Sequence, residues 1–165
     1  MKKIEKDILN ILKTNARIPA ADIAEMLSIS EKEATQTIEK LEKEGVLIQY
    51  TTVVNEEKFN GKDGTVRALI EIRVRPEKRS GFDTIAKRIA KHKNVIDLYL
   101  ISGQYDFMVV MEGKSLQEVS GFVSDILATM GSIVSTATHF IMRKYKEKGV
   151  LLEKESVRER LAVSP

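Results

Sequence analysis

The stretch Ile18–Leu47, IPAADIAEMLSISEKEATQTIEKLEKEGVL, has the pattern of two short helices joined by a tight turn. Ser30 and Glu33 form the S-x-x-E pattern of a capping box at the start of the second helix. The apolar positions that recur at helical spacing are Ile23, Ala24, Leu27, Ala34, Ile38 and Leu41. This stretch therefore predicts a helix-turn-helix.

A preceding helix completes this module. Ile4, Ile8, Ile11 and Leu12 lie on one face of a helix, and Gly45 is placed to end the last helix of the motif. Three helices of this size make a compact DNA-binding domain, which we assign to residues 1–47. A small helical bundle without a DNA role is the alternative interpretation.

The charge of the second helix of the motif is unusual for a DNA-reading helix. From Glu31 to Glu44 the sequence has three lysines, five glutamates and no arginine, although DNA is a polyanion. Residues 1–50 hold eight lysines and arginines against nine acidic residues, whereas residues 51–165 hold nineteen against fifteen. The net charge of +3 is therefore no argument for DNA contact through this module.

The composition excludes several classes of protein. Of 165 residues, 42% are hydrophobic and 31% are charged, which is typical of a globular protein in water. No apolar run approaches membrane-spanning length and no signal peptide is apparent, so we expect a cytoplasmic protein without a membrane partner. The chain has no cysteine and only two histidines, far apart, so we expect no metal site and no cofactor.

Residues 48–64 are expected to join two domains. Ile48 to Val54 are rich in β-branched and aromatic side chains and predict a strand. The polar residues that follow contain Gly61 and Gly64 and are typical of a domain boundary. The strand is either a wing of the helix-turn-helix or a linker that pairs with its copy in a partner subunit.

Residues 65–148 alternate between strand and helix patterns in the order β-α-β-β-α-β. The predicted strands cover residues 66–74, 95–102, 107–111 and 133–142, and the predicted helices cover residues 82–89 and 116–130. This order is that of a ferredoxin-like domain, so the fold class is α+β. One sheet face should be covered by the helices. The other face, with Leu69, Tyr99 and Ile101, should be free for an interface between subunits.

The chain resembles the Lrp/AsnC family of prokaryotic transcription regulators over nearly its whole length. The resemblance rests on KIEKDILNILKTNARIPAADIAEMLSIS at residues 3–30, LEKEGVLIQYTTVVN at residues 41–55 and LISGQYDF at residues 100–107. It implies a helix-turn-helix joined by a linker strand to a ferredoxin-like regulatory domain. It also implies homodimers and often octamers, double-stranded DNA as a partner, and a small-molecule effector, an amino acid or a related compound, bound between subunits.

The hairpin after the second predicted strand is the expected effector site. Gly103 permits a close approach of main-chain N–H groups, and Asp106 could accept from the α-ammonium group of an amino acid. The effector candidates in this hairpin are Ser102, Gly103, Gln104, Tyr105 and Asp106. The family resemblance adds Thr136 and Thr138 on the last strand. An ordinary hairpin turn is the alternative interpretation.

The DNA-contact candidates lie at the start and middle of the second helix of the motif. Lys32 and Lys40 could contact phosphates, Gln36 could pair with adenine, and Thr37 could contact a phosphate or a thymine methyl group. Ser30 and Glu33, at the head of the helix, complete the set. Family readers commonly carry basic residues where this chain has Gln36, Thr37 and Glu39. We therefore expect weak single contacts, which an oligomer strengthens by avidity.

Other functions remain open from the sequence. Sirohaem decarboxylases resemble the same two-domain layout with a disused helix-turn-helix, but the hairpin region SGQYD lacks the histidine and arginine that a carboxylated tetrapyrrole needs. We assign no catalytic residue. A sensor that does not bind DNA is the third possibility. The C-terminal extension, residues 149–165, could dock on a neighbouring subunit through Val150, Leu151 and Leu152.

Overall fold

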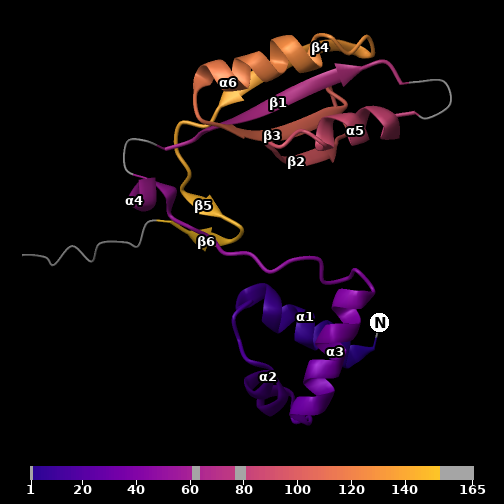
Figure 1. The fold of residues 1–165 in the computed structure, drawn as a ribbon, viewed down its shortest axis with the longest axis vertical. Helices are drawn as coiled ribbons and strands as arrows, with labels where there is room; N and C mark the ends of the chain where they lie inside the picture. The colour runs from indigo at the N-terminus through magenta and orange to yellow at the C-terminus, as the bar shows by residue number, and fades with distance from the viewer. Residues whose placement is uncertain (1, 61–63, 77–80, 153–165) are drawn as a thin grey trace, which may run out of the picture. The chain divides into compact units, whose positions relative to one another are not determined.

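The computed structural model describes residues 2–60, 64–76 and 81–152. The chain divides into two compact units, residues 1–54 and 55–165, and each is described by itself (Figure 1). We call them the N-terminal unit and the C-terminal unit.

The N-terminal unit consists of three helices around one apolar core. Helix α1 spans Lys3–Thr14, α2 spans Ala20–Leu27 and α3 spans Glu31–Lys43. The buried apolar side chains of the core are those of Ile8, Leu12, Ile23, Ala24, Ala34 and Leu41. These positions follow the predicted apolar stripes, so the helix-turn-helix prediction is confirmed.

The ends of α2 and α3 fix the turn between them. Ser28 has a φ of 54° after α2, and the Ser30 hydroxyl accepts from the Glu33 backbone N–H at 3.2 Å. In the described part of the chain the Glu33 side chain does not bond back to Ser30, so only half of the expected capping box forms. Gly45, with a φ of 67°, follows α3 as expected, because glycine adopts this backbone conformation without a steric penalty.

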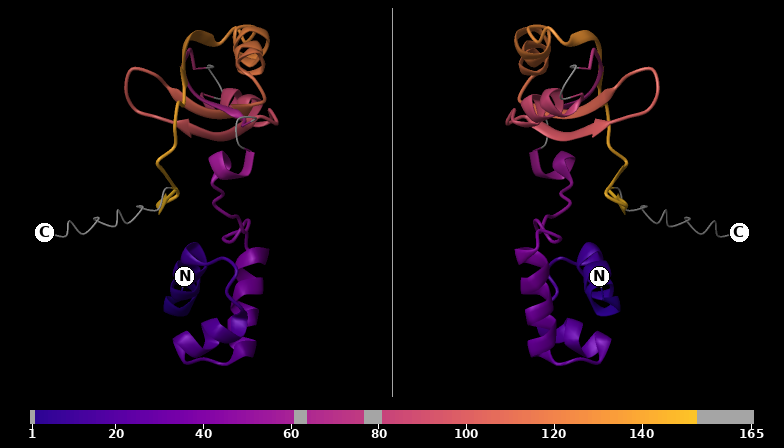
Figure 2. Two further views of the ribbon diagram at one scale, coloured as in Figure 1. Left: turned by 90° about the vertical axis from the view of Figure 1, so that its left-hand side faces the viewer. Right: turned by 90° about the vertical axis from the view of Figure 1, so that its right-hand side faces the viewer.

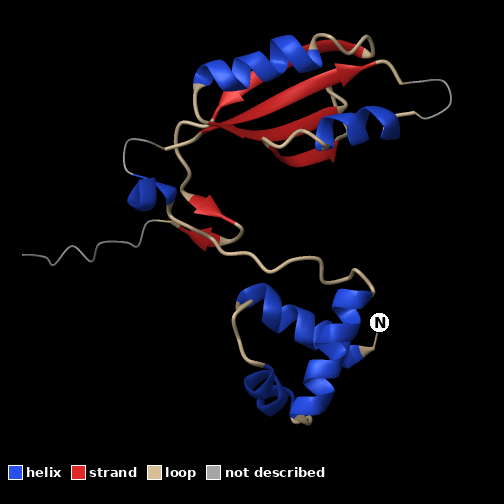
Figure 3. Cartoon of the chain, viewed as in Figure 1, coloured by secondary structure: helices blue, strands red, loops and turns tan. Residues whose placement is uncertain are grey.

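Residues 48–54 contain no strand, contrary to the expected linker strand (Figure 3). A strand needs a hydrogen-bonded neighbour, and no described segment of this chain pairs with these residues. Neither a wing nor a paired linker is therefore formed here. A short helix, α4 (Glu56–Asn60), follows in a stretch that we expected to be a loop.

The C-terminal unit is built on a four-stranded antiparallel sheet of order β2-β3-β1-β4. Its strands are β1 (Val66–Val74), β2 (Val95–Leu100), β3 (Phe107–Gly113) and β4 (Ile133–Phe140). Its helices are α5 (Asp83–Ala90) and α6 (Leu116–Gly121), which continues as a π-helical segment, η1 (Phe122–Leu127). The predicted ferredoxin-like order is confirmed (Figure 1).

Both helices of this unit pack on the same face of the sheet. Alternate residues of β1 and β3, such as Ile70 and Val109, form one buried cluster with Ile85, Ile89 and Val119 of the helices. The strand register places the other alternate residues on the opposite face, among them Leu69, which pairs with Val110, and Tyr99, which pairs with Met108. Tyr99 is 52% exposed. The predicted uncovered sheet face is therefore present in this chain.

A hairpin of two short strands follows the sheet. Strand β5 (Lys146–Glu147) pairs with β6 (Val150–Leu151) through Gly149, whose φ is 86°. The expected boundary between residues 148 and 149 therefore falls inside a hairpin. The Asn55 side-chain amide donates to the Leu152 carbonyl at 2.8 Å, which ties the beginning of the C-terminal unit to this hairpin. Residues 153–165 of the expected extension lie outside the described residues.

Candidate functional site

The solvent-facing side of α3 is the surface available for DNA. Lys32, Gln36 and Glu39 are exposed on this side, opposite the buried Ala34 and Leu41. Together with Glu31 and Thr35 they line one open, shallow surface. Lys32 and Gln36 were expected there. Thr35 and Glu39 were missed, although their helical phase relative to the buried residues could have identified them.

Lys40 has a partner within the N-terminal unit. Its ammonium lies 2.6 Å from the Glu5 carboxylate on α1, whose side chain is only 6% exposed, and 3.7 Å from Glu44. The hydrogen bond from Lys40 lowers the pKa of Glu5, and the same bond raises the pKa of Lys40. Lys40 therefore bridges α3 and α1 in this structure, and its expected contact with a phosphate would have to compete with Glu5.

Two other candidates on α3 use their hydroxyls within the helix. Thr37 donates to the Glu33 carbonyl at 2.8 Å, and Ser30 caps the helix as described above. Glu33 itself is exposed. These hydrogen bonds shape the helix and leave Lys32 and Gln36 as the candidates whose polar groups face solvent.

The hairpin Ser102–Asp106 joins β2 to β3 and stands out from the sheet as an open loop (Figure 2). Ser102, Gly103 and Gln104 are exposed, and Gly103 has a φ of 144°. Tyr105 is half-buried. The tip of the hairpin is therefore accessible, as a binding loop must be.

Asp106 holds this hairpin against the end of β1. Its carboxylate accepts from the Val74 N–H at 2.8 Å, while its own N–H donates to the Ile72 carbonyl at 3.0 Å. The carboxylate thereby continues the ladder beyond the last paired residue of β3. Asp106 thus has a structural role, besides the effector contact that we expected.

The two threonines of β4 lie at different distances from this hairpin. Thr136 pairs with Ile72, which on its other side pairs with Phe107, the residue that follows Asp106. Thr138 pairs with Ile70, two residues further along β1. Both side chains are half-buried. The structure therefore brings Thr136 to the same end of the sheet as the hairpin, whereas Thr138 lies further inside the sheet.

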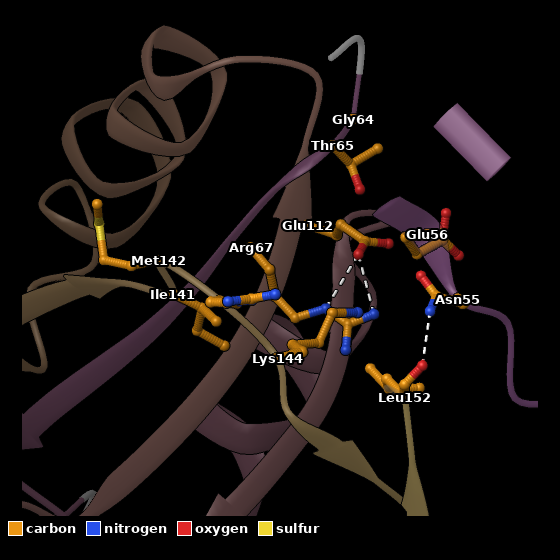
Figure 4. A pocket seen from close by; sticks show the side chains of 11 residues that line it. Asn55, Glu56, Gly64, Thr65, Arg67, Glu112, Ile141, Met142, Lys144 and Leu152 are labelled. Atoms are coloured by element: carbon orange, nitrogen blue, oxygen red, sulfur yellow. Dashed lines mark hydrogen bonds and ion pairs between the residues drawn. The ribbon is translucent and has the colours of Figure 1, made fainter. Parts of the chain in front are cut away.

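A pocket of about 140 Å³ lies at the opposite end of the sheet and was not anticipated (Figure 4). Its walls come from α4, the start of β1, the end of β3, the segment after β4 and the end of the β5–β6 hairpin. Asn55 and Leu152, joined by their hydrogen bond, lie at one side of it (Figure 4). No local sequence motif marks such a site because its residues are far apart in the chain.

Arg67 connects three strands beside this pocket. Its guanidinium donates to Glu112 on β3 through Nε at 3.0 Å and to Glu147 on β5 at 2.7 Å, and only 17% of its side chain is exposed. Lys144 also pairs with Glu147, at 3.3 Å. The hydrogen bond from Arg67 lowers the pKa of Glu147. This network attaches the β5–β6 hairpin to the sheet.

Neither a metal cluster nor a membrane span is found in the described ranges. Among these residues no group of three or more histidine, cysteine, aspartate or glutamate side chains could hold a metal ion. No helix described here is long and apolar enough to cross a membrane.

Two family models match the chain. Residues 1–48 match a winged helix-turn-helix DNA-binding family, and residues 67–151 match the Lrp/AsnC ligand binding domain. The chain belongs to the Lrp/AsnC family. It is a helix-turn-helix transcriptional regulator with a ligand-binding domain, as the LISGQYDF motif and the order of elements indicated.

Known proteins of similar sequence and fold agree with this assignment. This Lrp/AsnC chain is 44% identical over 161 residues to the HTH-type transcriptional regulator YugG of Bacillus subtilis, covering 98% of this chain and 96% of the relative. The transcriptional regulator NMB0573 of Neisseria meningitidis, crystallised with L-Met, is similar with a TM-score of 0.69 and 22% identity, over 89% of this chain and 93% of that protein. E. coli AsnC is similar with a TM-score of 0.67 and 20% identity, over 89% and 95%. At these identities the two structures support the fold.

Proposed function

We propose that this Lrp/AsnC regulator binds operator DNA as an oligomer, through several copies of α3, under the control of a small-molecule effector. The observation that carries the proposal is the exposed face of α3, where Lys32 and Gln36 point to solvent beside Glu39. Gln36 can make two hydrogen bonds to adenine, and Lys32 can contact a phosphate. The proposal places the protein in the cytoplasm, where it has access to the chromosome.

The low positive charge of α3 supports the oligomeric part of the proposal. Each phosphate contact releases counterions, so a reader with few cations binds DNA weakly by itself. Linking several readers to one DNA segment raises the local concentration of each after the first has bound. The uncovered sheet face, with Leu69 and Tyr99, is a suitable surface for assembling two or more copies, because the register aligns apolar side chains on it.

The effector part of the proposal concerns the hairpin Ser102–Asp106 together with Thr136. The Ser102 hydroxyl and the exposed main-chain N–H groups can donate to a carboxylate, and the carboxylate of Asp106 can accept from an ammonium group. The L-Met complex of NMB0573 is consistent with an amino acid as the class of effector. The effector acts by binding one assembly more tightly than another, which shifts the population of assemblies.

An enzymatic function has less support. The relatives compared here are named as transcriptional regulators. His92 stacks against Phe122, and His139 is paired with Glu71 on the uncovered sheet face, so neither histidine lies in the hairpin where a tetrapyrrole carboxylate would need it.

The test is fluorescence anisotropy of the full chain on the DNA upstream of its own gene, compared with shuffled DNA. We expect Gln36→Ala to reduce the discrimination between the two DNAs by about 1–3 kcal/mol, the value of one bidentate base contact. Gln117→Ala, an exposed glutamine on α6, is the matched control and should change nothing. Equal affinity of the unmodified chain for both DNAs, in the presence and absence of amino acids, would contradict the proposal.

A further inference from the structure

The pocket beside Arg67 combines three kinds of wall. Basic groups come from Arg67 and Lys144, acidic groups from Glu56 and Glu112, and apolar surface from Ile141 and Leu152. Figure 4 shows these side chains around one hollow, with Glu56 and Asn55 on the side of α4 and Ile141 on the other side. With a volume of about 140 Å³ the pocket is smaller than the roughly 300–1,000 Å³ typical of drug-sized ligands, so its occupant must be a small metabolite.

Arg67 retains hydrogen-bonding capacity toward such an occupant. A guanidinium has five N–H donors, and among the described residues Arg67 uses three of them, one on each nitrogen, for Glu112 and Glu147. One N–H on each terminal nitrogen is left over. Lys144 is held only by a 3.3 Å contact to Glu147 and has further donors. A carboxylate could therefore be accepted without breaking the Arg67 network.

The charge of the lining selects among ligand classes. A simple anion would be repelled by Glu56 and Glu112, and a simple cation would be repelled by Arg67 and Lys144. An uncharged apolar molecule would leave these charged groups partly desolvated without new partners. A zwitterion that carries a carboxylate, an ammonium group and a short apolar side chain satisfies all three walls.

We propose that this pocket binds an α-amino acid with an apolar side chain, at a site separate from the Ser102–Asp106 hairpin. Arg67 and Lys144 hold the carboxylate, Glu56 and Glu112 hold the ammonium group, and Ile141 and Leu152 contact the side chain. The proposal does not depend on the hairpin being an effector site.

The position of the pocket gives the ligand a route to the rest of the chain. Asn55 and Glu56 line it, and they are the first residues of the C-terminal unit, directly after the linker residues 48–54. A ligand that contacts α4 stabilises the segment from which the N-terminal unit is tethered. Hydrogen exchange at residues 55–60 should therefore slow when the ligand is bound.

The test begins with the full chain and the twenty amino acids. Thermal shift identifies those that bind, and isothermal titration calorimetry measures the affinity of the strongest binder. We expect Lys144→Gln and Glu56→Gln each to weaken it by roughly tenfold or more, because each removes a charged hydrogen-bond partner. Lys146→Gln, an exposed lysine on the same hairpin that does not line the pocket, is the matched control and should bind normally.

Further measurements separate this site from the alternatives. Thr65→Phe, which fills the mouth of the pocket from an exposed position, should abolish binding if Lys144→Gln proves unstable. Analogues of the bound amino acid that lack either the amino or the carboxyl group should bind much more weakly. Gln104→Ala, at the tip of the other hairpin, should bind normally. No binding by any amino acid, or binding that is lost in Gln104→Ala but retained in Lys144→Gln and Thr65→Phe, overturns the proposal.

Discussion

Lys40, on the helix proposed to read DNA, has its ammonium 2.6 Å from the nearly buried carboxylate of Glu5 on α1. This ion pair joins two helices that are 35 residues apart in sequence at this point. It makes Lys40 part of the packing of the N-terminal unit, and it removes one of the few cations of α3 from the surface that faces solvent.

The first prediction separates Lys40 from Lys32. Lys40→Gln should lower the thermal stability of the N-terminal unit, because it leaves the Glu5 carboxylate without its charged partner. Lys32→Gln should leave stability unchanged. It should reduce the slope of log affinity against log salt by about 0.9 for each lost phosphate contact. Calorimetry and salt-dependent anisotropy make the two measurements. The reverse pattern would show that Lys40 is the main phosphate contact.

The second prediction concerns the pH dependence of the same pair. The pKa of Glu5 is lowered from 4.5 by the hydrogen bond from Lys40 and by the Lys2 backbone N–H. Its contribution to stability is therefore complete above pH 4.5 and is lost as the pH falls below that value. The pKa of Lys40 is raised from 10.5, so its contribution is complete below pH 10.5 and is lost only above it.

The measurement is urea unfolding between pH 3 and pH 7, a window of about four units around the acid limb, followed by hydrogen exchange of residues 3–43. Glu5→Gln should be less stable than the unmodified chain at pH 7, and the difference should shrink toward pH 3. A constant difference across this window would mean that the charge of Glu5 is not involved.

The third prediction separates the structural role of Asp106 from effector binding. Asp106→Ala leaves the Val74 N–H without its acceptor and should lower the free energy of unfolding by about 1–3 kcal/mol. Asp106→Asn retains an oxygen acceptor and should cost less. Ser102→Ala, on the exposed part of the hairpin, should change effector binding without changing stability. Chemical unfolding and calorimetric titration of the three variants test these expectations.

The fourth prediction tests the uncovered sheet face. Leu69→Glu and Tyr99→Asp each place a carboxylate on this face, and both should favour the monomer because an apolar interface does not accommodate an unpaired charge. DNA affinity should fall together with the assembly size seen by light scattering. Gln117→Glu, which adds the same charge on exposed α6, should alter neither property. A monomeric variant that keeps full operator affinity would exclude the role of avidity.

Local periodicity was sufficient to predict most of the fold. The stripes of Ile8 and Leu41 and the alternation in β1 arise from the geometry of single elements, so they are visible without the structure. The strand expected at residues 48–54 failed because strand propensity forms no strand without a neighbouring backbone. The same reasoning overestimated the capping box at Ser30, whose second half does not form.

The sites were less predictable than the fold. Gln36 and Lys32 could be placed on the solvent-facing side of α3 from spacing alone. The engagement of Lys40 could not, because it depends on how α1 packs against α3. The pocket beside Arg67 could not be predicted either, since its walls come from five segments that only the completed fold brings together.

The hydrogen bond between Asn55 and Leu152 means that the C-terminal unit begins and ends at the same place on its surface. A unit whose two ends are adjacent can be cut out, inserted into another chain, or circularly permuted with little loss of contacts. This ligand-binding unit should therefore be portable: fused after residue 54 to an unrelated DNA-binding domain, it should fold unchanged and transfer its response to that domain.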